Sequence, residues 1–251
     1  MTDTPAKRIR VRYSVSGKVR FLSHRDVARV TERAIRRAGV PVAYTQGYSP
    51  RPKMQYGLAL STGYESTGEY IDIYLDPERE GMVDPAEIAV ALDACMPRGL
   101  DVLAASLVDS TEGSLQDSVE STGWEVQVAA DDPAATELPG RVEALMGADH
   151  HEIEIVRKGK PVREDLRPLV FDLVLKVPAS AGGDGGAEPL LLMAELGTKP
   201  RSIRPSELLG ALGVSEPVKV RRTHQWTNRD GNRGEPLGLE VPSQRTELCA
   251  I

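Results

Sequence analysis

The chain has 251 residues, of which 40% are hydrophobic and 27% charged, and this globular composition excludes a wholly disordered protein. Its apolar runs are only as long as a strand, which argues against a membrane span of ~20 apolar residues, and its two cysteines exclude a disulfide framework or a Cys-rich metal cluster held by this chain alone. The N-terminal residues also lack the apolar stretch of a signal peptide, so we expect a soluble, cytoplasmic protein. We expect it to need no metal or other cofactor.

The net charge of −6 is distributed unevenly. Residues 1–56 contain 13 Lys+Arg and 3 Asp+Glu (+10), residues 57–150 contain 3 and 20 (−17), and residues 151–251 contain 15 and 14 (+1). Such asymmetry can mark a surface for a polyanion, although a dedicated nucleic-acid binder is usually basic throughout. Since salt screens charges beyond about 8–10 Å, a basic patch in the first segment can bind independently of remote acids.

The first half of the chain begins with residues 8–15, whose alternating polar and apolar side chains predict a half-buried strand. A helix is predicted from His24 to Ala38, because Ser23 and Asp26 have the spacing of an N-terminal cap and Gly39 suits the end of a helix. Further strands are predicted at 40–44, 54–60, 69–75 and 100–107, and a short helix at 85–95.

The second half repeats this order more loosely. It has predicted strands at 124–128, 153–157, 169–177, 190–196 and 218–226, and predicted helices at 137–146 and 205–212. Both halves therefore indicate β-α-β-β-α-β, the order of ferredoxin-like domains, and the predicted fold class is α+β with two tandem ferredoxin-like modules and antiparallel sheets. The predicted domains are a basic, Tyr-rich module (1–108), a linker (109–123), a second module (124–227) that contains a flexible loop at 178–186, and a flexible tail (228–251).

A row of cations follows one side of the first predicted helix. Helical spacing places Arg25, Arg29, Arg33 and Arg36 on one ridge, where like charges repel by a few tenths of a kcal/mol per pair. Stability alone would not favour such a ridge, whereas phosphate groups or an acidic protein surface would relieve it. The alternative is a solvated face that pairs with the acidic residues at 65–93 of the same module.

Aromatic residues accompany this basic region. All seven tyrosines lie between Tyr13 and Tyr74, and basic side chains interleaved with aromatic rings suit unpaired bases, which need charge neutralisation and stacking. In the segment 47–53, two prolines stiffen a loop that presents Tyr48, Arg51 and Lys53. We interpret this loop as functional, and we expect Tyr44, Tyr48 and Tyr56 to serve binding and Tyr70 and Tyr74 to serve packing.

Several of these motifs occur together in one known family. The sequences KVRFLSHRD (18–26), ERAIRRAG (32–39), YSPRPK (48–53), GYES (63–66) and EYID (69–72) resemble the radical-SAM-associated bacterial family of unknown function. That family occurs as a stand-alone protein or as a C-terminal domain on cobalamin-binding radical SAM proteins. The resemblance covers the first hundred residues and implies a bacterial cytoplasmic protein that works with a radical SAM enzyme on RNA or the translation apparatus. The chain has no Cys-x-x-x-Cys-x-x-Cys triplet, so it cannot itself hold a radical SAM cluster.

An enzymatic alternative comes from the predicted architecture. Two tandem ferredoxin-like modules also resemble CRISPR repeat-processing endoribonucleases, which can cleave RNA without metal through a histidine. His24 is the weak candidate for a general acid/base, with Tyr48 or Lys53 placed to stabilise developing charge. The Gly-rich RNA-clamping signature of those enzymes is missing near the C-terminus, so we favour a protein without catalytic residues.

Other motifs give weaker indications. The run Asp149-His150-His151-Glu152 could bind a metal, but adjacent residues rarely converge on one ion, and we favour a loop. His224 and Trp226 lie on one face of the last predicted strand and could stack on a base. No Walker loop, dinucleotide fingerprint or nucleophile elbow is present.

Three hypotheses follow for the function. The first is a non-catalytic RNA-binding or adaptor protein for tRNA or rRNA, with no indication of DNA specificity or membrane binding. The second is a docking module for an acidic face of a radical SAM protein, and the third is a metal-independent ribonuclease. The residues predicted to bind RNA or another anion are His24, Arg25, Arg29, Arg33, Arg36, Tyr48, Arg51 and Lys53.

Overall fold

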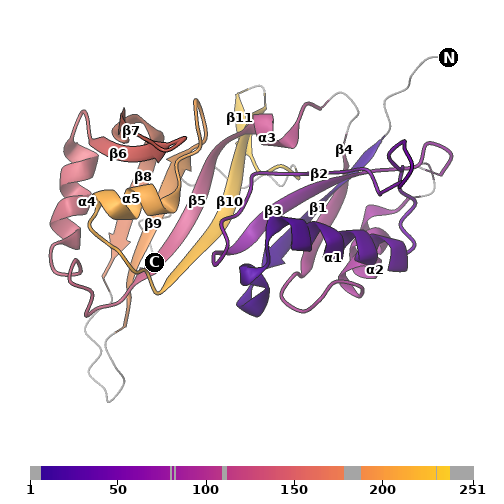
Figure 1. Cartoon of the computed structure of the whole chain (residues 1–251), viewed down its shortest axis with the longest axis horizontal. Coiled ribbons are helices and arrows are strands. Elements are labelled where there is room, and N and C mark those ends of the chain that lie inside the picture. The colour runs from indigo at the N-terminus through magenta and orange to yellow at the C-terminus, as the bar shows by residue number, and fades with distance from the viewer. Residues whose placement is uncertain are drawn as a thin grey trace. The chain divides into compact units, whose positions relative to one another are not determined.

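A computed structural model describes residues 7–79, 81, 83–108, 112–177, 188–229 and 231–237 of the chain (Figure 1). The fold is α+β, with mostly antiparallel strands and few helices, and it divides into two units. Unit 1 combines Met1–Val119 with Gln225–Ile251, and unit 2 is Glu120–His224. Among the described residues, no helix has both the length and the apolar character that crossing a membrane requires.

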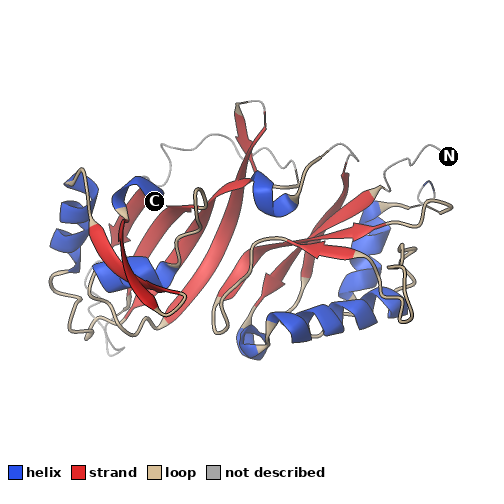
Figure 2. Ribbon diagram, turned by 45° about the horizontal axis from the view of Figure 1, so that its top comes forward, coloured by secondary structure: helices blue, strands red, loops and turns tan. Residues whose placement is uncertain are grey.

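Unit 1 is built on an antiparallel sheet with the strand order β4-β1-β3, and β2 pairs with β3. Helices α1 and α2 lie on one face of this sheet (Figures 1 and 2), and the apolar core lies between them and the strands. Part of β10 also belongs to this unit, where Gln225 Nε2 donates to the carbonyl oxygen of Gly68 at 2.7 Å. The elements are β1 (Arg8–Val15), η1 (Gly17–Phe21), α1 (His24–Arg37), β2 (Met54–Tyr56), β3 (Glu65–Tyr74), α2 (Pro85–Asp93), β4 (Val102–Val108), α3 (Leu115–Ser118), β10 (Lys219–Arg229) and β11 (Asn232–Gly234).

Helix α1 forms where the sequence predicts it. The Ser23 side chain accepts a hydrogen bond from the backbone N–H of Asp26 at 3.2 Å, and Gly39, with φ +67°, follows the helix. The buried side chains of Val27, Ala34 and Ile35 recur at helical spacing and pack into the core, so the opposite face of α1 is left to solvent.

The strands around α1 differ from the predicted ones. The segment 40–44 contributes only two isolated bridges, and β2 covers three residues instead of the predicted 54–60. Prolines at 41, 50 and 52 remove backbone donors, which prevents a regular ladder. Strand β3 begins at Glu65 rather than at residue 69, because its polar first residues are buried by pairing with β1.

The sequence predicted a half-buried strand at β1, but the strand is buried on both faces. Glu112 and Glu235, together with the carbonyl groups of Glu112 and Pro236, cover its polar face by binding Arg8, Arg10 and Arg12. The predicted linker at 109–123 and the predicted tail from 228 onward are therefore partly ordered, since they contain α3, the start of β5, and β11. Residues 109–111, 230 and 238–251 of these predictions lie outside the described residues.

Unit 2 has the strand order β10-β5-β9-β8, in which β5 pairs with β9 and β9 with β8, both antiparallel. The hairpin β6-β7 forms a separate two-stranded sheet, and its second strand was not predicted. The predicted loop at 178–186 lies outside the described residues. The elements are β5 (Val119–Val128), α4 (Leu138–Gly147), β6 (Glu152–Arg157), β7 (Lys160–Asp165), η3 (Arg167–Leu169), β8 (Val170–Lys176), β9 (Leu190–Gly197) and α5 (Pro205–Ala211).

Candidate nucleic-acid interface

The outer face of α1 presents four exposed guanidinium groups, on Arg25, Arg29, Arg33 and Arg36. Arg29 lies 3.4 Å from Asp26, in an exposed pair on the same helix. The other three make no ion pair within the part of the chain that the structure describes, so the alternative of pairing with the acids at 65–93 is not observed there. Between Arg25 and Arg36 the row extends about 16 Å along the helix.

The proline-containing loop packs beside this helix. Its base is closed by hydrogen bonds from the backbone N–H of Thr45 to the carbonyl of Arg51 (2.9 Å) and from that of Lys53 to the carbonyl of Ala43 (2.8 Å). Tyr48 is fully exposed near the tip, and Arg51 Nη1 lies 4.0 Å from Glu32 Oε1 on α1. The loop therefore presents a free aromatic ring and a guanidinium group next to the arginine row.

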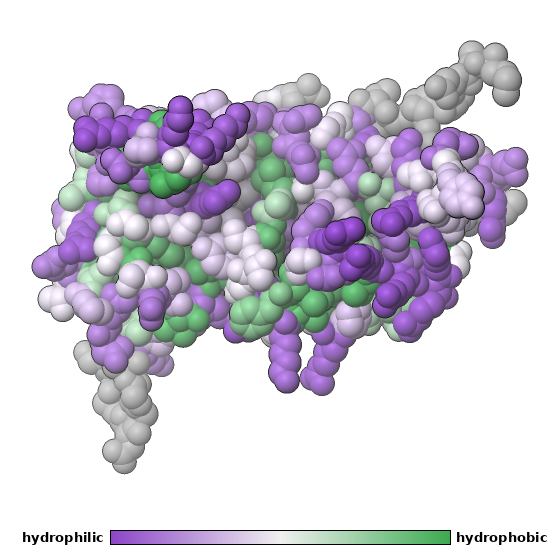
Figure 3. Space-filling model, in the orientation of Figure 1, coloured by the Kyte–Doolittle hydropathy of each residue, from purple (hydrophilic) through white to green (hydrophobic). Residues whose placement is uncertain are grey.

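The structure brings most of the predicted residues together and separates two of them. Lys53 Nζ lies 4.4 Å from the centre of the Tyr74 ring on β3, and His24 contacts the Tyr56 ring edge-on at 4.9 Å, at the other end of α1 from Arg36. Figure 3 shows strongly hydrophilic side chains gathered over α1 and the adjoining loops. We call Arg25, Arg29, Arg33, Arg36, Tyr48 and Arg51 the arginine surface.

The tyrosines contribute less to this surface than the sequence suggested. Tyr44 and Tyr48 are exposed, but Tyr56 packs against the core, and burial together with the nearby Glu32 carboxylate raises the pKa of Tyr56 to about 12. Tyr56 therefore stays protonated at physiological pH and cannot act as a base there. The interpretation of Tyr56 as an exposed binding residue is corrected, because its ring completes the apolar wall beside Thr31 and His24 of α1.

Sequence reasoning missed an exposed aromatic residue, Phe21. Its side chain is 61% exposed at the end of η1, and the guanidinium of Arg20 lies 4.6 Å from its ring centre. An apolar ring left in solvent under a cation is suited to stacking. The signal in the sequence was an aromatic residue next to a cation, Arg20-Phe21, two residues before the Ser23 cap.

The count of +10 for residues 1–56 overstates the free positive charge of this region. Arg8, Arg10 and Arg12 lie on one face of β1 and pair with Asp72, Glu112 and Glu235. Burial raises the pKa of Glu235, although the Arg12 guanidinium opposes this shift. These arginines are neutralised inside unit 1, whereas the arginines of α1 face solvent.

Two of the histidines, His24 and His150, make defined contacts with neighbouring side chains. His24 is exposed and contacts the Tyr56 ring, and among the described residues it makes no hydrogen bond that would orient it as a general base. His150 Nδ1 lies 2.8 Å from Asp165 Oδ2, which holds the turn before β6. No cluster of three or more His, Cys, Asp or Glu side chains is arranged for a metal ion in these residues.

The chain matches the model of one family and is distantly similar to solved structures. The model of a family described as "Uncharacterized protein conserved in bacteria (DUF2344)" matches residues 8–205. No curated protein matches the chain. A chain in the structure entitled "Crystal Structure of a Cbf5-Nop10-Gar1 Complex" is similar over 86% of this chain, with a TM-score of 0.45 and 8% sequence identity. The match covers 48% of that chain, so the present chain spans about half its length.

Proposed function

The chain belongs to this uncharacterized bacterial family, and from that premise we propose that it is a non-catalytic RNA-binding protein that holds RNA through the arginine surface. The RNA class would be tRNA or rRNA, bound in the cytoplasm by guanidinium–phosphate contacts and by stacking of a base on Tyr48.

The observation that carries this proposal is the row formed by Arg25, Arg33 and Arg36. All three are exposed on one helix face and have no carboxylate partner among the described residues. Like charges at helical spacing cost a few tenths of a kcal/mol per pair, so the row does not serve folding. Phosphate oxygens would neutralise it, and the planar guanidinium group pairs with phosphate at two points.

Filter binding at stepped salt concentrations tests the proposal. Wild-type protein should bind tRNA or an rRNA fragment with an affinity that falls steeply as salt rises. The slope of log affinity against log salt should become less steep by about 2 in the triple variant Arg25→Gln, Arg33→Gln, Arg36→Gln. Each lost phosphate contact with single-stranded RNA reduces this slope by about 0.7. A salt-independent affinity in the wild type would refute phosphate binding.

A matched control is available in unit 2. Lys158, Lys160 and Arg163 of the β6-β7 hairpin are also exposed cations without an ion pair among the described residues. Their replacement by Gln removes the same charge and should leave the salt dependence unchanged. An equal effect of both triple variants would show that net charge, not the arginine surface, determines binding.

We further propose that the protein works with a radical SAM enzyme, on the basis of the motif resemblance at residues 18–72. The same surface could dock an acidic face of that partner instead of RNA. Co-purification that survives nuclease treatment would favour direct docking, and loss of the partner after nuclease would favour a complex bridged by RNA.

We also propose that each unit is a ferredoxin-like module. The strand order β4-β1-β3-β2 in unit 1 and β10-β5-β9-β8 in unit 2, with a helix between the first and second and between the third and fourth strands along each module, supports this assignment. A crystal structure with other strand orders would contradict it.

A further inference from the structure

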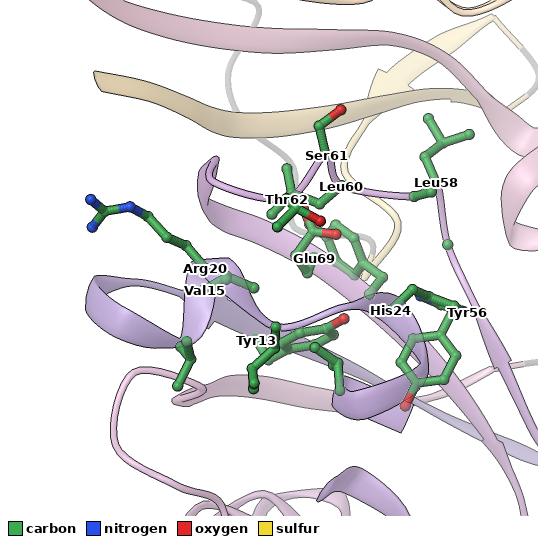
Figure 4. A pocket seen from close by; sticks show the side chains of 16 residues that line it. Tyr13, Val15, Arg20, His24, Tyr56, Leu58, Leu60, Ser61, Thr62 and Glu69 are labelled. Carbon is green, nitrogen blue, oxygen red and sulfur yellow. The ribbon is translucent and has the colours of Figure 1, made fainter. Parts of the chain in front are cut away.

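Unit 1 contains a small cavity at the N-terminal end of α1. Figure 4 shows Arg20 on one side of it and His24 and Tyr56 on the other. Its volume of about 40 Å³ leaves room for a few water molecules and not for a larger ligand. The edge strand β4, in contrast, leaves backbone hydrogen-bonding groups open to a partner.

The orientation of the β4 backbone follows from the pairing of its neighbour β1. The backbone N–H of Leu75 donates to the carbonyl oxygen of Lys7 at 2.9 Å, so the odd-numbered residues of β1 exchange hydrogen bonds with β3. The even-numbered residues of β1 therefore bond to β4, and their partners there are Ala104, Ser106 and Val108. The N–H and C=O groups of the intervening residues, Ala105 and Leu107, face away from β1.

This open edge is regular from Ala104 to Val108, because the register with β1 shifts just before Ala104. Within the part of the chain that the structure describes, the N–H groups of Ala105 and Leu107 have no acceptor, and the Leu107 carbonyl accepts only the Ser106 hydroxyl, at 3.3 Å. An unpaired strand edge of this kind is a template for another strand.

The side chains of β4 do not prevent such pairing. Edge strands usually carry a charge or a proline for this purpose, and β8, at the edge of the unit 2 sheet, has Asp172 and Lys176. The sequence of β4 is VLAASLV, in which Leu103 and Leu107 are half-exposed, and Val90 is exposed on α2, which packs against β4. An uncharged, apolar strand suits neither a phosphate backbone nor an acidic protein face, but it matches a copy of itself.

We propose that unit 1 pairs with a second copy of this chain through β4, edge to edge and antiparallel. With Ser106 on the two-fold axis, Ala105 of each copy is opposite Leu107 of the other, and both residues exchange their outward hydrogen bonds. A shift of the axis to Ala105 or Leu107 would leave one of these residues unpaired. The two Ser106 hydroxyl groups also meet on the axis, where a hydrogen bond between serines supports the pairing.

The interface expected from this edge is small. Stable complexes bury about 800 Å² per partner, and a single short strand edge with a few apolar neighbours lies below that size, so we expect a dimer that dissociates on dilution. Residues directly opposite each other on antiparallel strands point to the same face of a sheet. Helices α1 and α2 of both copies would therefore lie on one side of the joined sheet.

Sedimentation velocity of the full chain, freed of nucleic acid by nuclease, measures the association. The mass should rise from that of one chain toward that of two as the protein concentration increases. Leu107→Lys places a charge on the open edge and should keep the protein monomeric, with its fold checked by circular dichroism. The matched control is Phe171→Lys, a half-exposed position on the edge strand β8, which should associate as the wild type does. A wild type that stays monomeric at every concentration, or equal association of the two variants, would overturn the inference.

Disulfide cross-linking tests the register, in a background that carries Cys95→Ser and Cys249→Ser. With the axis at Ser106, the Cα atoms of its two copies are about 4.5 Å apart, within the range that a disulfide can bridge. The two copies of Ala104 are about 14 Å apart, because each is opposite Val108 of the other chain. Ser106→Cys should therefore form a covalent dimer under mild oxidation, and Ala104→Cys, on the same face, should not. Equal cross-linking at both positions, or none in Ser106→Cys, would also overturn the inference.

Discussion

Arg10 and Asp72 form a two-point ion pair between β1 and β3, with Nε 2.7 Å from Oδ1 and Nη2 2.9 Å from Oδ2. The two residues are directly opposite in the strand register, and their side chains are 1% and 0% exposed. The arginine is further satisfied by Glu112 and by the carbonyl oxygen of Pro236. The pair shows that the basic residues of this chain serve two purposes, since those of β1 are structural and those of α1 face solvent.

Removal of Arg10 should strongly destabilise the protein. Arg10→Met leaves Asp72 buried without its main partner, which costs about 3–5 kcal/mol in the free energy of unfolding. Asp72→Leu combined with Arg10→Met should cost much less than the sum of the two single changes. Urea unfolding of the four proteins measures this coupling, and additive effects would contradict it.

Neutralising the outer face of α1 should not harm the fold. Gln has nearly the helix propensity of Arg, and the triple variant at Arg25, Arg33 and Arg36 removes like-charge repulsion of a few tenths of a kcal/mol per pair. We therefore expect its Tm at low salt to equal or slightly exceed that of the wild type, with the difference vanishing at high salt. A clear loss of Tm would show that these arginines hold the structure.

Tyr48→Ala should weaken RNA binding without changing its salt dependence. A stacked base contributes about 1–3 kcal/mol, and the fully exposed ring makes no contribution to the core. The matched control is Phe171→Ala on β8, an aromatic residue that is 52% exposed in unit 2. Filter binding with single-stranded RNA compares the two variants, and only Tyr48→Ala should bind more weakly. An unchanged affinity of Tyr48→Ala would exclude stacking on this loop.

Stability should fall at alkaline pH through Tyr56. Its pKa is raised to about 12 in the folded protein by burial, so between pH 10 and pH 12 the unfolded chain loses this proton while the folded chain keeps it. The contribution of Tyr56 is constant below about pH 10, and on the order of 2 kcal/mol is lost by about pH 12. Denaturant unfolding at pH 9 and pH 11.5 should show a smaller loss in Tyr56→Phe than in the wild type; an identical loss would contradict the burial of this hydroxyl.

The protein should not cleave RNA through His24. The ring lacks a hydrogen-bonded partner in the described residues that would set its tautomer, and neighbouring Tyr56 is held protonated. Incubation with tRNA in EDTA should leave the RNA intact. Cleavage that persists in EDTA and disappears in His24→Ala would instead support the ribonuclease hypothesis.

Local patterns predicted the parts of the candidate site that depend on few neighbouring residues. The extent of α1 followed from the Ser23 cap and the spacing of Val27, Ala34 and Ile35, and this periodicity also determines which arginines face solvent. The loop at 47–53 followed from its prolines. Interactions within one helix or turn are set by residues three to six positions apart, so they can be inferred without knowing the fold.

The role of a charged residue on a strand could not be inferred in this way. Arg10 and Arg33 are the same type of residue. Arg10 is nevertheless enclosed by Glu112 and Pro236, which lie 102 and 226 positions away in the chain. Glu69 likewise belongs to a regularly alternating strand, and only the packing of η1, α1 and the segment from Leu58 to Thr62 places its carboxylate in a pocket. The amino-acid sequence by itself determined which side chains share a face of each element. Only the tertiary structure decided which of those faces are covered, because burial depends on segments that approach from far along the chain.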